Sequence, residues 1–146
     1  MDPVEAAEAR FRGSFNCAQS VLAALAPRLG LPEATALKVG AAFGNGIGRS
    51  GNVCGAVTGA LMAIGLRYGT TDGSDEAAKE TTYTVAEEFM ARFRDRHQYV
   101  VCSELLGCDM GTPEGRQAAL ERGLYDSVCV GLVRDAVVIA QELLKD

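Results

Sequence analysis

Cysteine is the residue type in this sequence best suited to chemistry, and four of its five cysteines fall near predicted helix starts. The first turn of a helix presents free backbone N–H groups and a partial positive charge, which favour a thiolate. A thiolate is both the reactive nucleophile and the form that binds metals. Converging helix starts would therefore suit a small anionic centre with four thiolate ligands, namely Cys17, Cys54, Cys102 and Cys129.

The spacing of these cysteines argues against several common sites. They are separated by 37, 48 and 27 positions, unlike the compact cysteine runs of ferredoxins. None of them forms a CxxC pair, which is the local signature of zinc ribbons and thioredoxin-like proteins. No CxxCH occurs, which excludes covalent haem attachment. Taken singly, a cysteine on an apolar helix face is usually a small buried hydrophobic residue.

A glycine-rich segment precedes the second of these cysteines. Gly46 to Gly51 spells GxGxxG, but the predicted helix before it argues against a dinucleotide site, which needs a strand there. A flexible loop whose backbone N–H groups approach a sulfur or an anion is the better interpretation. We therefore expect contacts to a bound group from the loop and the helix after it, at Gly48, Arg49, Gly51, Gly55 and Gly59.

The elements that must position these residues are helices, because period-2 alternation is nearly absent. Helix-start signals include Asn16 with Gln19 at capping-box spacing, and Thr112 before Pro113. The segment from Cys54 to Leu66 is apolar on all sides, as expected of a buried central helix. Residues 1–146 are therefore predicted to form a single all-α domain, a helical bundle around this glycine-rich helix. The predicted helices cover Pro3–Arg12, Asn16–Pro27, a segment opening at Pro32, Cys54–Leu66, Asp75–His97, Thr112–Gly123 and Ser127–Leu144.

Composition places the chain among soluble globular proteins. Its 146 residues are 48% apolar and 23% charged, which excludes intrinsic disorder and coiled-coil rods. A formal net charge of −5 without a Lys/Arg cluster argues against binding to nucleic acid. The longest apolar stretch, Val53 to Leu66, is too short to span a bilayer. Because no signal peptide is visible, we expect a cytoplasmic, reducing location.

The cysteine pattern resembles that of a known family. Cys17, the segment Cys54-Gly55-Ala56-Val57-Thr58-Gly59, and then Cys102 and Cys129 look like the bacterial and archaeal C_GCAxxG_C_C family. Members are described as redox-active, and a related segment occurs in split-Soret cytochromes, which carry an iron–sulfur centre beside their haems. The resemblance therefore implies that the four cysteines bind an iron–sulfur cluster, with [2Fe–2S] as first choice. It implies a role in electron transfer or redox sensing.

Other functions remain open. A thiol–disulfide oxidoreductase would use Cys54 as the attacking thiolate and Cys17 as its partner, and these two would then be the catalytic residues. A structural or storage site would hold Zn²⁺ or Cu⁺ through thiolates. A structural disulfide between Cys17 and Cys54 would contribute about 3–4 kcal/mol of stability. Because the sequence offers no acid–base pair, we expect a redox carrier rather than an enzyme with its own substrate.

Further expectations concern single residues and partners. Cys108 is extra to the family pattern, and His97, the only histidine, is expected in a solvated position. The small-residue face of Gly55, Gly59 and Ala63 favours a homodimer, and an unidentified redox protein is the expected partner. The sequence also predicts that Asn52 caps the central helix and that Cys129 lies in the first turn of the last helix. It predicts that Leu37 and Ala41 face inward.

Overall fold

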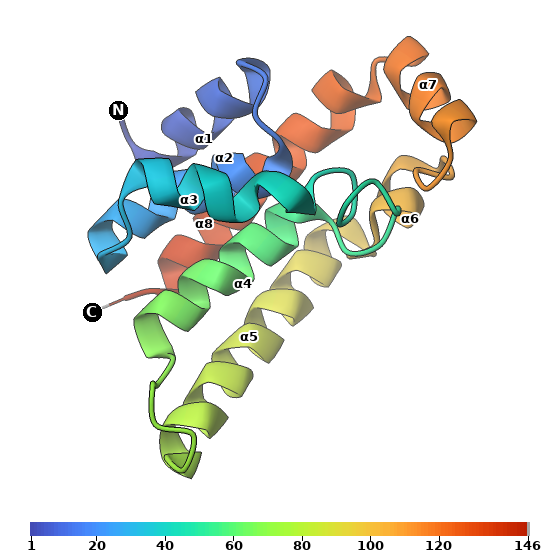
Figure 1. Cartoon of the computed structure of the whole chain (residues 1–146). Helices are drawn as coiled ribbons and strands as arrows, with labels where there is room; N and C mark the ends of the chain where they lie inside the picture. Colours follow the sequence, from blue (N-terminus) through green and yellow to red (C-terminus); the bar gives the residue numbers. More distant parts are fainter. Residues whose placement is uncertain (146) are drawn as a thin grey trace.

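The computed structural model describes residues 1–145, and within them the chain is helical apart from loops and one isolated β-bridge. The all-α prediction is thus confirmed. Both chain termini lie at one end of the molecule, and α6, α7 and the glycine-rich loop lie at the other (Figure 1). The α-helices are α1 (Pro3–Arg12), α2 (Cys17–Leu25), α3 (Glu33–Gly40), α4 (Gly55–Tyr68), α5 (Glu76–His97), α6 (Cys102–Leu106), α7 (Pro113–Glu121) and α8 (Val130–Leu143). Shorter helical turns cover Ala26–Leu29, Ala41–Phe43 and Tyr125–Cys129, the last of them a π-turn.

Side-chain caps start the helices where the sequence predicted them. The Asn16 side chain accepts a hydrogen bond from the Gln19 N–H at 2.8 Å, and the Gln19 side chain accepts one from the Asn16 N–H at 2.9 Å. Thr112 caps α7 by accepting a hydrogen bond from the Gly115 N–H at 3.0 Å. These bonds satisfy N–H groups that the first turn of a helix leaves unpaired. The capping box of α2 thereby fixes Cys17 at the first helical position.

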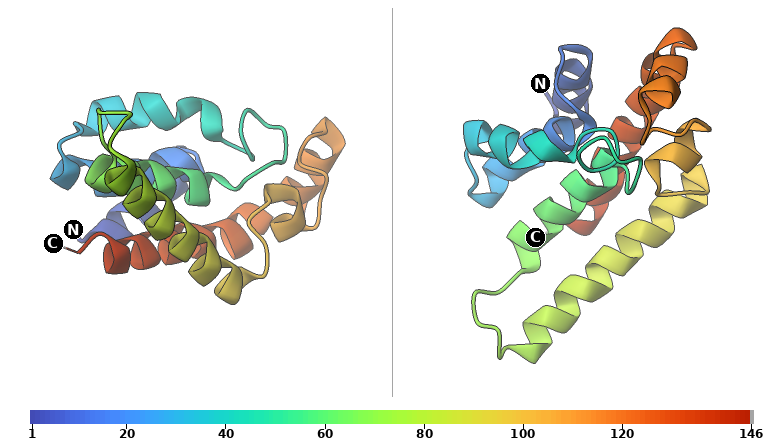
Figure 2. Two further views of the ribbon diagram at one scale, coloured as in Figure 1. Left: turned by 90° about the horizontal axis from the view of Figure 1, so that it is seen from below. Right: turned by 45° about the vertical axis from the view of Figure 1, so that its right-hand side comes forward.

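Helix α4 lies at the centre of the fold, in contact with α2, α5 and α8. Figure 2 shows the long α5 running beside α4 in two further views. Phe89 and Phe93 of α5 are fully buried in the core, with ring centroids 6.1 Å apart. The predicted glycine-rich central helix is therefore confirmed. Although α4 is apolar, none of the described helices is both long and apolar enough to cross a membrane.

The glycines of α4 let α2 approach closely. A Cβ added at Gly55 would lie 2.8 Å from the Ala18 nitrogen, and one at Gly59 would lie 2.8 Å from the Ala18 carbonyl oxygen. Real Cβ atoms essentially never come so near, so only glycine fits at these two positions. Ala63 on the same helix is fully buried as well. The small-residue face that favoured a homodimer is thus covered within the chain itself and offers no surface to a second copy.

Two helix starts differ from the sequence prediction. The backbone is helical from Leu124 through the π-turn Tyr125–Cys129, so Cys129 lies inside a helical segment and not in its first turn. The N-cap of α4 is Cys54 itself, and not Asn52. The sequence alone does not show whether Asn52 or Cys54 is the N-cap. The pairing of this segment with a distant part of the chain decides where α4 begins.

The inward face of α3 also differs from the prediction. Ala36 and Gly40 are the buried residues, one position before the expected Leu37 and Ala41. Ala41 is exposed and Leu37 is half-buried. The reason is that α3 packs on α2 through Gly40, where an added Cβ would lie 3.0 Å from the Gln19 nitrogen. Because Gly40 makes this contact, the buried face of α3 lies one position away from the face that its apolar residues predict.

His97 is packed between helices and not solvated as expected. Its side chain is 19% exposed, and its Nε2 atom lies 2.8 Å from the Asp135 carboxylate of α8. The imidazole ring also packs on Phe93, with ring centroids 4.7 Å apart. The histidine therefore joins the end of α5 to α8.

Replacing Gly59 by alanine is expected to lower the free energy of unfolding by about 1–3 kcal/mol, the usual range for an overpacked core. The added methyl group collides with the backbone of Ala18 in α2. The matched control is Gly65→Ala in the same helix, where nothing lies within 4 Å of the added Cβ. Alanine should there raise the free energy of unfolding by about 0.5–1 kcal/mol. Urea denaturation followed by circular dichroism measures both changes, and equal changes would contradict the close contact of α2 with α4.

Candidate functional site

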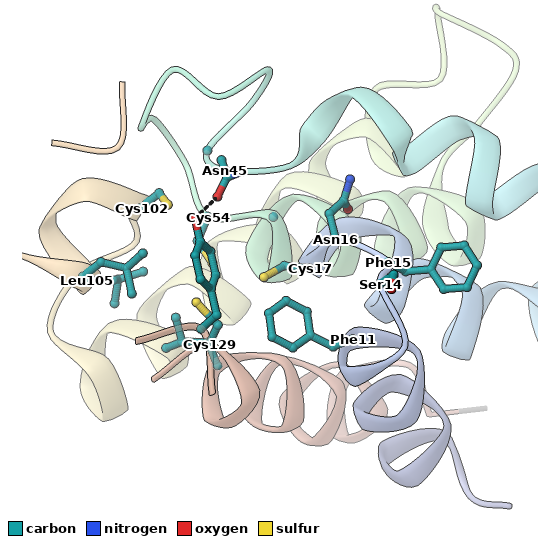
Figure 3. A pocket seen from close by; sticks show the side chains of 15 residues that line it. Phe11, Ser14, Phe15, Asn16, Cys17, Asn45, Cys54, Cys102, Leu105 and Cys129 are labelled. Atoms are coloured by element: carbon teal, nitrogen blue, oxygen red, sulfur yellow. Dashed lines mark hydrogen bonds between the residues drawn. The ribbon is translucent and has the colours of Figure 1, made fainter. Parts of the chain in front are cut away.

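Four cysteines from four separate segments line one cavity of about 290 Å³. Cys54, Cys102 and Cys129 are 3%, 8% and 5% exposed, and Cys17 is half-buried. Figure 3 shows the labelled cysteines gathered around this space, next to α2 and the glycine-rich loop. All five cysteines of the chain are free thiols. The structure thus brings together the four residues that the sequence singled out as ligands.

A short antiparallel pairing positions two of these cysteines. An isolated β-bridge joins the residues just before Cys54 and Cys102. The Cys54 N–H donates to the Val100 carbonyl at 2.8 Å, and the Cys102 N–H donates to the Asn52 carbonyl at 2.6 Å. Each cysteine lies at the start of a helix, α4 or α6. Two cysteines 48 positions apart in the sequence are thereby held side by side.

Cys17 is positioned by the residue before it and by the packing of α2. The Asn16 amide group donates to two backbone carbonyls at the end of α3, at 3.3 and 3.2 Å, in addition to capping α2. The close approach of α2 to Gly55 of α4 brings Cys17 next to Cys54. The Cys17 sulfur lies within hydrogen-bonding reach of the sulfur atoms of Cys54 and Cys129.

Cys129 is the last residue of the π-turn, a rare conformation that often occurs at functional sites. Tyr125 is the first residue of this turn and lines the same cavity. Its hydroxyl donates to the Asn45 side chain at 3.1 Å, the dashed line in Figure 3. The glycine-rich loop and the last helical segment are thereby joined at the cavity. Neither Tyr125 nor Asn45 was identified from the sequence, because neither belongs to a motif.

The glycine-rich loop borders the cavity through Asn45 and Gly46. Residues 45–49 all have left-handed φ angles, between 51° and 72°. Among the residues expected to contact a bound group, Gly55 lines the cavity. Arg49 is exposed, so its charge faces solvent. Outside the cavity lining lie Gly48, Arg49, Gly51 and Gly59.

The thiols of the cavity differ in acidity. Hydrogen bonds with the sulfur atoms of Cys129 and Cys54, together with burial, raise the pKa of Cys17 well above its usual range. The Cys17 hydrogen bond lowers the pKa of Cys54, helped by backbone N–H groups in the first turn of α4 and opposed by burial. Burial and the neighbouring sulfur atoms raise the pKa of Cys102 to about 12. Cys54 is therefore the cavity thiol whose surroundings favour the thiolate.

A family model with the description "Putative redox-active protein (C_GCAxxG_C_C)" matches residues 15–143. The chain belongs to this family. In this member of the C_GCAxxG_C_C family the central motif reads Cys54-Gly55-Ala56, with cysteine and glycine in the reverse order to the family's name. No curated protein and no solved structure matches the chain. The relation to split-Soret cytochromes stays a prediction. The family assignment makes redox activity the functional class of the protein.

Cys108 lies outside the cavity of this C_GCAxxG_C_C protein. It is half-buried at the edge of a second, smaller apolar cluster that includes Cys102. The guanidinium of Arg122 lies 3.5 Å from the Cys108 sulfur. Cys108 thus packs against the cluster that contains Cys102 and Cys129 but does not line the cavity, which makes it a matched control for the four cysteines that do.

The type of ligand atom and the volume of the cavity limit which groups the site can hold. Thiolates are soft ligands that suit zinc, copper(I) and iron–sulfur groups. Within residues 1–145, no three Cys, His, Asp or Glu side chains are arranged to hold a single metal ion. A mononuclear tetrahedral site needs its four sulfur atoms about 2.3 Å from one ion. The cavity of about 290 Å³ leaves room beside the thiols for a group of several atoms.

In the reduced, metal-free protein, the Cys102 thiol should make stability fall as the pH rises from about 9 to about 12. Its folded-state pKa of about 12 lies above the ordinary value of 9.0. The folded state therefore favours the neutral thiol, whose stabilisation is complete below pH 9.0 and is lost as the pH rises through 12. Urea unfolding at several pH values measures this slope. Cys102→Ser should make the slope shallower, and an unchanged slope would contradict the burial of this thiol.

Proposed function

We propose that this protein is a redox carrier in which Cys17, Cys54, Cys102 and Cys129 hold an iron–sulfur cluster, with [2Fe–2S] as first choice. The observation that carries the proposal is the convergence of four cysteines, far apart in the sequence, on one cavity. When bound, such a group supplies one-electron transfer. The protein would accept one electron from a reduced partner protein and pass one to an oxidised partner, as a carrier or a sensor.

The charge balance of the cavity supports this proposal. The residues that line it include no charged side chain. Four thiolates alone would place four negative charges in a largely buried space, which is costly without compensation. The compensating positive charge must then come from the bound group, and iron ions supply it. The backbone N–H groups in the first turn of α4, which lower the pKa of Cys54, would help set the reduction potential.

A second function, thiol–disulfide exchange, is favoured by Cys54 and Cys17. The pKa of Cys54 is lowered, and Cys17 lies within hydrogen-bonding reach of it. The Cys54 thiolate would attack a substrate disulfide, form a mixed disulfide and release one substrate thiolate. Cys17 would pass its proton to that thiolate and attack the Cys54 sulfur, forming the Cys17–Cys54 disulfide and releasing the second substrate thiolate. Two electrons pass to the substrate. The 3% exposure of Cys54 places this function second.

The remaining alternatives have less support. A single Zn²⁺ or Cu⁺ ion would use the same thiols but would fill less of the cavity of about 290 Å³ than a cluster. A structural disulfide between Cys17 and Cys54 is not formed, since both are free thiols. We infer a reducing compartment, the cytoplasm of a bacterium or archaeon, because free cysteines persist there.

The test is iron and acid-labile sulfide content, with a visible spectrum, after anaerobic purification and reconstitution. Wild-type protein should contain both elements and show sulfur-to-iron charge-transfer bands. Cys→Ser substitution at position 17, 54, 102 or 129 should weaken retention of the group by at least about tenfold. Cys108→Ser is the matched control and should retain it, because Cys108 lies outside the cavity lining.

Two results would contradict the proposal. One is a colourless wild-type protein without iron after reconstitution. The other is loss of iron in Cys108→Ser to the same extent as in Cys54→Ser. If the colourless protein also reduces a disulfide substrate, and Cys54→Ser abolishes that activity, thiol–disulfide exchange takes first place.

A further inference from the structure

We propose that Tyr125 shields one side of the four-cysteine cavity, and that its hydrogen bond to Asn45 holds the ring in this shielding position. The molecules concerned are small reagents. Electrophiles and oxidants react with the thiols, and chelators compete with the thiols for a bound metal. This inference goes beyond the proposed function, because it holds whichever group the thiols carry.

The ring of Tyr125 lies between the cavity and the molecular surface. Phe11 and Tyr125 line the cavity, and both also line a shallower hollow on the outside of the protein. The outer hollow is completed by Arg12, Asp126 and Val130. A side chain that borders both spaces separates them. Movement of the Tyr125 ring would therefore join the hollow to the cavity and open a second path to the thiols, in addition to the side that the exposed Ser14 and Phe15 line.

One hydrogen bond fastens this ring. The Tyr125 hydroxyl donates to the Asn45 side chain at 3.1 Å, which joins residues 80 positions apart. The backbone that carries Asn45 is left-handed over residues 45–49 and includes the β-branched Ile47 at a φ of 67°. Such a conformation is disfavoured for residues other than glycine and persists only where its surroundings hold it. Backbone hydrogen bonds hold the loop, among them Gly48 N–H to the Ala42 carbonyl at 2.8 Å, so Asn45 is a fixed acceptor and loss of the bond releases the Tyr125 ring.

The segment that carries Tyr125 also carries one of the cavity thiols. Tyr125 begins and Cys129 ends the π-turn, which holds more residues per turn than an α-helix. Conversion of the turn to α-helix would rotate Tyr125 relative to Cys129, so movement of the ring is linked to the position of one cavity thiol. Asp126 beside the ring pairs with Arg12 at 2.7 Å, but this pair is exposed and contributes little. The bond to Asn45 therefore decides where the ring rests.

The test is the rate at which N-ethylmaleimide modifies each cysteine of the reduced, metal-free full chain, followed by mass spectrometry. Tyr125→Phe keeps the ring and loses the hydroxyl, whereas Asn45→Gly removes the acceptor and suits the left-handed backbone. Each variant should speed modification of Cys17 and Cys54 by about twofold to tenfold, as expected for the loss of one neutral hydrogen bond. The double variant should be no faster than the faster single variant, because both remove the same bond. Asn45→Asp keeps an acceptor and should not speed modification of either cysteine.

Two controls separate opening of the cavity from general loosening of the fold. Cys108 lies outside the cavity lining, so its rate should not change in any variant. Tyr83→Phe alters a tyrosine that is 63% exposed on α5, and it should leave all rates unchanged. Wild-type rates at Cys17 and Cys54 in both Tyr125→Phe and Asn45→Gly would overturn the proposal. Equal acceleration of Cys108 would also overturn it. Because the assay uses metal-free protein, a failure to bind iron would contradict the proposed function and leave this inference intact.

Discussion

The pairing of residues 51–54 with residues 100–103 is the contact on which the arrangement of the site depends. Val53 and Val101 form the bridge, and hydrogen bonds of 2.8 and 2.6 Å from the N–H groups of Cys54 and Cys102 flank it. Buried backbone donors need such partners, because leaving them unpaired is costly. The same pairing makes α4 and α6 begin at one place, with a cysteine at the start of each. A change that separated these segments would move two of the four thiols apart.

The positions of the other two thiols, Cys17 and Cys129, depend on other features of the fold. Glycine in α4 costs about 1 kcal/mol of helix propensity against alanine. That cost is offset by the close approach of α2, which sets Cys17 next to Cys54. Cys129 depends on the π-turn that precedes α8. Three features thus bring the thiols together: the β-bridge, the glycine contact between α2 and α4, and the π-turn. No compact cysteine motif is needed for this, so the cysteines can lie far apart in the sequence.

Local signals predicted most of the fold, and long-range contacts account for the rest. Asn16 with Gln19 and Thr112 carry their cap signals in the sequence, so those helix starts could be predicted. The bridge beside Cys54 is too short to show a strand pattern, which is why the sequence alone predicts Asn52 as the cap. A π-turn has no propensity signature, so the sequence predicts Cys129 in a first turn. Tyr125 and Asn45 meet across 80 positions and carry no motif that would have paired them.

Anomalous diffraction at the iron absorption edge, from crystals grown without oxygen, tests most directly whether the four cysteines act as one ligand set. The account predicts iron peaks inside the cavity, bonded to the sulfur atoms of Cys17, Cys54, Cys102 and Cys129, with Cys108 apart from them. Iron bound elsewhere, a cavity without iron after reconstitution, or ligation by Cys108 in place of one of the four would contradict it.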